Sequence, residues 1–71
     1  MTRAQFIFRI WVAIAKGWKL PAAEALPFAR LAYRDFMRDV GVPFGHHSYA
    51  WDVSAANVVA EEYALRFGEA A

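Results

Sequence analysis

Apolar side chains recur at helical spacing in three separate stretches of this chain, and no stretch alternates apolar and polar residues for long enough to predict a strand. Residues at positions i, i+3, i+4 and i+7 share one face of a helix, so each stretch predicts an amphipathic helix. We therefore expect an all-α fold: one three-helix domain over residues 1–71, with helices near residues 4–16, 21–40 and 52–67.

The first predicted helix is apolar on nearly every side. Phe6, Phe8 and Val12 lie off the stripe that follows the helical period, and Gly17 is expected to cap the C-terminal end. A helix that is apolar all round is buried from more than one side. We expect a second copy of the chain to supply one of the covering surfaces, through an interface that includes Phe6, Ile7, Ile10, Trp11 and Ile14.

Size and composition give a second reason to expect a homodimer, or a partner that covers the excess apolar surface. A core in a chain of fewer than about 70–80 residues rarely supplies more than roughly 3–5 kcal/mol of stability. The chain has 71 residues and no cysteine for a disulfide. Its residues are 59% hydrophobic and 17% aromatic, more than so small a domain can hide.

The ends of the second and third predicted helices carry recognisable signals. Pro21 suits the first turn of the second helix, whereas Pro27 either kinks that helix or begins it, leaving residues 21–26 as a separate turn. Gly41 is expected to end the second helix. The third helix is expected to start at an N-cap, Asp52 or Ser54, and to bury Ala56, Val59, Ala60, Tyr63 and Phe67 before it stops at Gly68.

The segment VPFGHHSYAW (residues 42–51) separates these two helices, and its proline and glycine oppose regular structure. Loops are usually polar because they lie on the surface, yet this one holds three aromatic residues. Two interpretations stay open: the rings plug the end of the helical core with the histidines as a polar rim, or the segment anchors a protein interface. The residues concerned are Phe44, His46, His47, Tyr49 and Trp51.

Three arginines on the second helix form the other candidate binding surface. Arg30, Arg34 and Arg38 are spaced four residues apart, which aligns their guanidinium groups on one face. This arginine stripe is either a solvated surface, partly neutralised by a pair between Asp35 and Arg38, or a docking surface for carboxylates or phosphates.

The chain lacks the residue patterns of an enzyme or a metal protein. His46 and His47 have no close Asp, Glu or Cys that would complete a metal or acid–base site, and no nucleophile triad or phosphate-binding glycine loop is present. We therefore predict no catalysis, no cofactor, no metal and no small-molecule substrate.

Charge and hydropathy bear on partners and location. Residues 1–38 hold seven of the 8 basic side chains, and residues 39–71 hold five of the 7 acidic ones, which suits halves that fold together or an antiparallel dimer. Gln5, Arg9 and Lys16 interrupt the apolar N-terminal run, so we expect no transmembrane helix and prefer a cytoplasmic protein to a cleaved signal peptide.

The sequence supports two other functions less well. The stretch RIWVAIAKGWKLPAAEAL has the spacing of a helix-turn-helix, with Ala13 four residues before Gly17, but the helix after the turn offers only Glu24 before Arg30 where base contacts are needed. Nucleic acid is therefore the less favoured partner. A membrane-surface peptide that uses its aromatic N-terminus is a more distant alternative.

The stretch GWKLPAAEALPFARLAYRDF, with Arg3 and the aromatic first helix before it, resembles the small helical early proteins of transposable temperate phages. The resemblance covers roughly the first half of the chain. It implies a phage-encoded inhibitor that binds and occludes a host quorum-sensing regulator, pilus-assembly ATPase or defence complex, as a homodimer in the bacterial cytoplasm.

Overall fold

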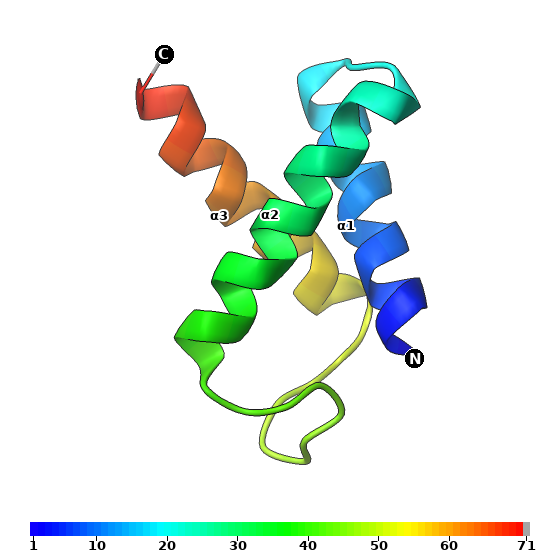
Figure 1. Cartoon of the computed structure of the whole chain (residues 1–71), viewed down its shortest axis with the longest axis vertical. Helices are drawn as coiled ribbons and strands as arrows, with labels where there is room; N and C mark the ends of the chain where they lie inside the picture. Colours follow the sequence, from blue (N-terminus) through cyan, green and yellow to red (C-terminus); the bar gives the residue numbers. More distant parts are fainter. Residues whose placement is uncertain (71) are drawn as a thin grey trace.

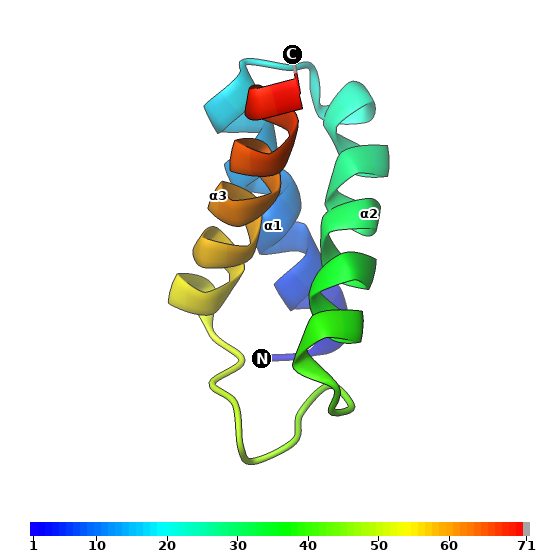
Figure 2. The same cartoon turned by 90° about the vertical axis from the view of Figure 1, so that its left-hand side faces the viewer.

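The computed structural model describes the backbone of residues 1–70 and the side chains of residues 1–66, and it has the predicted all-α three-helix fold. Helix α1 spans Arg3–Trp18, α2 spans Ala22–Val40 and α3 spans Val53–Ala70. The helices α1 and α3 both begin at the end of the molecule that holds the loop after α2, and α2 runs in the opposite direction (Figures 1 and 2). The Cα radius of gyration is 11.6 Å, close to the value of about 11 Å expected for a folded chain of this length.

Both ends of α1 differ from the sequence prediction. Its start is fixed by a capping box, in which the Gln5 N–H donates to Thr2 Oγ1 (3.1 Å) and the Thr2 N–H donates to Gln5 Oε1 (2.9 Å). Gly17 does not cap the helix, because it lies inside α1. The left-handed capping residue is Lys19, with φ 55° and ψ 44°.

Helix α2 runs continuously through Pro27, so residues 21–26 form no separate turn. Pro27 offers no N–H to the carbonyl of Ala23, four residues earlier, but both residues lie on the exposed side of α2, where water can bond that oxygen. Gly41 ends the helix as predicted. It adopts φ 71° and donates its N–H to Met37 O at 3.2 Å.

Asp52 caps α3, as one of the two predicted alternatives, since the Ala55 N–H donates to Asp52 Oδ1 at 2.9 Å. The helix continues past Gly68, where it was expected to stop. Four of the five residues predicted to face the core are buried: Ala56, Val59, Ala60 and Tyr63. The fifth, Phe67, has a side chain outside the described ones.

The core lies around α1, which packs against both other helices, whereas α2 and α3 touch each other much less. Its largest fully buried side chains are Phe6, Ile10 and Ile14. On α2 the buried positions facing them are Ala25, Ala29 and Ala32. Small residues let two helix backbones approach closely, so α1 packs closely against α2.

Three of the five residues predicted for the dimer interface are covered within one chain. Phe6, Ile10 and Ile14 are 0%, 0% and 1% exposed within a single chain, so they have no surface left for a second copy. Trp11 is half-buried and donates its Nε1–H to Ala22 O at 2.7 Å, which ties α1 to the start of α2. Helix α1 is buried from two sides, as its all-round apolarity predicted, but α2 and α3 of its own chain cover both.

Candidate functional site

The loop of residues 41–52, named here the aromatic loop, packs its rings on the core. The Phe44 and Trp51 rings lie 4.7 Å apart between centroids. Both meet Phe6 edge-to-face, Phe44 at 5.6 Å and Trp51 at 5.7 Å. These are the separations and orientations that aromatic pairs favour, and they continue the core to the loop end of the molecule.

Tyr49 and Trp51 fasten the loop to α2. The Tyr49 ring packs against Phe36 at 5.2 Å and against Trp51 at 5.0 Å. Trp51 Nε1–H donates to His46 O at 2.9 Å, which closes the loop on itself. The three aromatic rings of the loop therefore behave as the core-plug interpretation predicts, each half-buried. Binding of a partner by their exposed edges stays a prediction.

The two histidines form the rim of this plug. The Ser48 N–H donates to His46 Nδ1 at 3.1 Å, so this ring nitrogen acts as an acceptor, and Ser48 Oγ lies 2.7 Å from the same atom. The His46 and His47 rings stack 4.4 Å apart. Among residues 1–66, no group of three or more His, Asp or Glu side chains could hold a metal ion.

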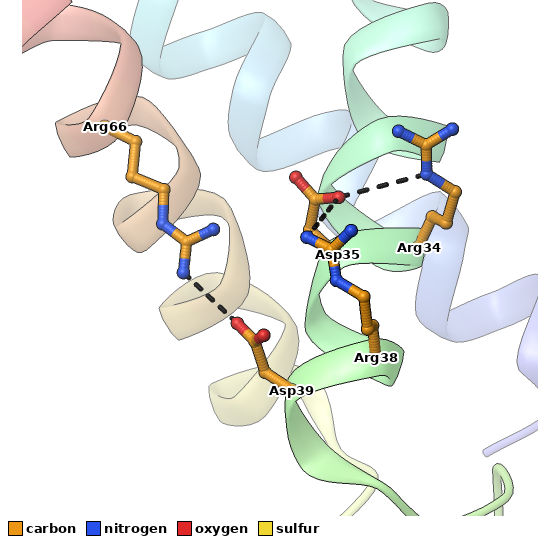
Figure 3. A network of polar contacts seen from close by, with 5 residues as sticks. All are labelled: Arg34, Asp35, Arg38, Asp39 and Arg66. Atoms are coloured by element: carbon orange, nitrogen blue, oxygen red, sulfur yellow. Dashed lines mark hydrogen bonds and ion pairs between the residues drawn. The ribbon is translucent and has the colours of Figure 1, made fainter.

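The arginine stripe lies on the solvent side of α2. Arg30, Arg34 and Arg38 are exposed, and the side chains of the latter two are 71% and 70% accessible. Asp35 Oδ1 lies 3.3 Å from Arg38 Nη2 and 3.9 Å from Arg34 Nε (Figure 3). The predicted pair of Asp35 with Arg38 is therefore present, and the same carboxylate lies within ion-pair distance of Arg34.

A groove of about 240 Å³ separates α2 from α3 beside this network. Its walls carry Asp35, Asp39 and Glu62 around aromatic residues of the core. Arg66 of α3 reaches across and donates to Asp39 Oδ2 at 3.2 Å, as Figure 3 shows. This exposed ion pair spans the groove, and such pairs contribute little stability.

Two tyrosines near these surfaces titrate above their ordinary range. Burial raises the pKa of Tyr33, against a smaller lowering by the nearby charge of Arg3. Burial also raises the pKa of Tyr63, helped by the negative charge of Asp35 and opposed by Arg34. Both phenols are therefore neutral at physiological pH and act as packing groups.

Sequence reasoning missed one charged surface, in which α1 and α3 lie side by side. Arg9 and Lys16 of α1 and Glu61 of α3 line a common groove of about 490 Å³. Val12, which lies off the main stripe of the first helix, lines this groove. The helical period alone does not indicate that α3 lies beside Val12.

Within the described part of the chain, no helix is both long and apolar enough to cross a membrane. No family model, curated protein or solved structure matches this chain.

Proposed function

We propose that this protein is a small non-catalytic binding module that uses the arginine stripe of α2 to cover an acidic surface on a protein target. The observation that carries the proposal is that Arg30, Arg34 and Arg38 are exposed on one face of a helix that is itself fixed to the core. Arginine presents a planar fork of donors that fits carboxylates in pairs of hydrogen bonds.

The carboxylate of Asp35 supports this role because it restrains the stripe. An arginine on a free surface loses rotamer entropy when it binds, and restraint before binding reduces that loss. Asp35 engages Arg34 and Arg38 through one oxygen, Oδ1, and both guanidinium groups keep most of their surface open to solvent. With Arg30 included, the stripe keeps a net positive charge.

The scaffold supports the same role. Phe36 lies on α2 between two of the arginines, and its ring stacks on Phe6 of α1 at 6.0 Å and meets Tyr49 of the aromatic loop. These contacts hold the C-terminal half of α2 in place. A rigid surface binds with less loss of entropy than a flexible one.

The resemblance to phage early proteins supplies the class of target. The module would act in the cytoplasm of a bacterial host, where it occludes a regulator, a pilus-assembly ATPase or a defence complex. Self-association into a homodimer belongs to the same proposal, on a surface other than the buried residues Phe6, Ile10 and Ile14.

Binding of DNA is the second candidate, favoured by the short turn of residues 19–21 between α1 and α2 and by the basic stripe. The start of α2 nevertheless exposes Ala22, Ala23 and Glu24, which are not residues that read base edges. A DNA-binding protein would retain duplex DNA strongly at low salt and lose it steeply as salt rises.

The test is quantitative capture from a nuclease-treated bacterial lysate on the immobilised chain. We expect a set of proteins that wild type and Lys19→Glu retain equally, and that Arg34→Glu and Arg38→Glu retain at least about tenfold less. Lys19→Glu is the matched control, because it reverses an exposed positive charge away from the stripe. Equal capture by all variants contradicts the proposal. Salt-sensitive binding of an added DNA duplex by the purified chain, in a separate assay, selects the second candidate.

A further inference from the structure

The groove between α1 and α3 is hollow because small residues line it. Its lining includes Ala13 and Gly17 on α1 and Ala64 on α3, while Trp18 forms part of its apolar floor. The α1 and α3 helices lie side by side here and run from the same end of the molecule (Figures 1 and 2).

The two sides of this groove carry opposite charges. Arg9 and Lys16 project from α1, and Glu61 projects from α3. Among the described side chains, none of these three forms an ion pair, and the ion pairs that do form involve Asp35 and Asp39. The charges of the α1–α3 face are therefore available to another molecule.

Apolar surface lies between and beside these charges. Val53 lines the groove and is 41% exposed, and Val12 lies half-buried in the same lining. A face with a basic edge, an acidic edge and apolar residues between them is complementary to itself when it is turned over.

We propose that a second copy of this chain binds the α1–α3 face, with Arg9 and Lys16 of each copy against Glu61 of the other. A two-fold axis along the groove achieves this, because it sets α1 of one copy against α3 of its partner. An axis across the groove would set α1 against α1 and bring positive charges together. Charge complementarity therefore selects the first arrangement.

The available area fits a dimer of this kind. A standard interface buries about 800 Å² on each partner, roughly a sixth of the 4748 Å² surface of this chain. The face of two helices can provide that. The dimer would also cover apolar surface that the small three-helix core leaves exposed, including Val53.

The test is sedimentation of the full chain from about 1 to about 100 µM, with charge-reversal variants. Wild type is expected to dimerise in this range, and Arg9→Glu and Glu61→Arg are each expected to weaken the dimer at least about tenfold. Mixing the two variants should restore a dimer, since both cross-chain contacts then pair Glu with Arg. Restoration on mixing identifies the contact as intermolecular, because within each chain the two charges still have the same sign.

Arg30→Glu and Glu24→Arg reverse matching charges on α2, away from the groove, and should leave the dimer unchanged; circular dichroism shows whether each variant is folded. A wild-type monomer throughout the range overturns the proposal. So does a dimer that neither groove variant weakens, since its interface must then lie elsewhere, or weakened dimers that mixing does not restore.

Discussion

The indole Nε1–H of Trp51 donates a 2.9 Å hydrogen bond to the backbone carbonyl oxygen of His46. The bond closes the aromatic loop while the Trp51 ring packs on Phe6. The adjacent histidines therefore sit where they do because the backbone turns there to meet an aromatic plug. Their own ring contacts are local, to Ser48 and to each other.

Replacing Trp51 should destabilise the fold. We expect Trp51→Ala to lower the free energy of unfolding by about 3 kcal/mol, because it removes a half-buried ring from the core. Trp51→Phe keeps a ring but loses the hydrogen bond to His46. The lost bond should cost about 1 kcal/mol, and the smaller ring should cost further free energy through lost packing. Chemical denaturation measures both. His47→Ala, at an exposed position, is the control and should change the free energy of unfolding little. An equally small effect of Trp51→Ala would show that the loop is not part of the core.

Ile14 tests whether α1 is covered by its own chain. We expect Ile14→Ala to cost about 3 kcal/mol, since its side chain is 1% exposed within the monomer. The cost should not depend on protein concentration. Val58→Ala, at a position that is 46% exposed, should change stability by less than about 0.5 kcal/mol. A cost for Ile14→Ala that grows with protein concentration would show that this residue lies at an intermolecular interface.

The two left-handed positions predict opposite effects of glycine. Lys19 holds φ 55° with a side chain, so Lys19→Gly should stabilise the protein by about 1 kcal/mol. Gly41 holds φ 71°, and Gly41→Ala should destabilise by a similar amount, although a Cβ there meets nothing within 4 Å. Thermal unfolding of the two variants separates backbone strain from packing, because packing alone predicts no loss for Gly41→Ala.

The raised pKa values of Tyr33 and Tyr63 predict a loss of stability at alkaline pH. In the unfolded chain both phenols ionise near pH 10, whereas in the folded chain burial delays ionisation. Their contribution is thus fully present below about pH 10 and is lost as the pH rises from there through the folded-state pKa. Tyr33→Phe should reduce the alkaline decline in the free energy of unfolding. If the alkaline decline is the same in Tyr33→Phe as in wild type, the ionisation of other groups causes it.

The sequence predicted the three helices because their apolar spacing is long and regular, and it placed two ends correctly because Gly41 and Asp52 have distinct capping chemistry. Lys19 was missed as a cap because a non-glycine residue rarely adopts positive φ. The dimer interface at Ile10 and Ile14 was wrong for a physical reason. Periodicity shows that a face must be covered, but not whether the covering helix comes from the same chain.

The candidate site was predictable in composition and less so in arrangement. The arginine stripe follows from spacing alone, and the structure adds that Asp35 contacts two of its members. The charges at Arg9 and Glu61 lie more than fifty positions apart in sequence, and only the packing of α3 beside α1 brings them to one groove.

The most direct measurement is the affinity of the purified captured partner for the wild-type chain and for stripe variants, by titration calorimetry. We predict that Arg34→Ala and Arg38→Ala each weaken binding by about 1–3 kcal/mol, and that Arg→Lys at either position restores only part of it, because lysine keeps the charge but not the fork. Circular dichroism and unfolding should show an intact fold, since both side chains are exposed. Equal affinity of wild type and both alanine variants would contradict the account.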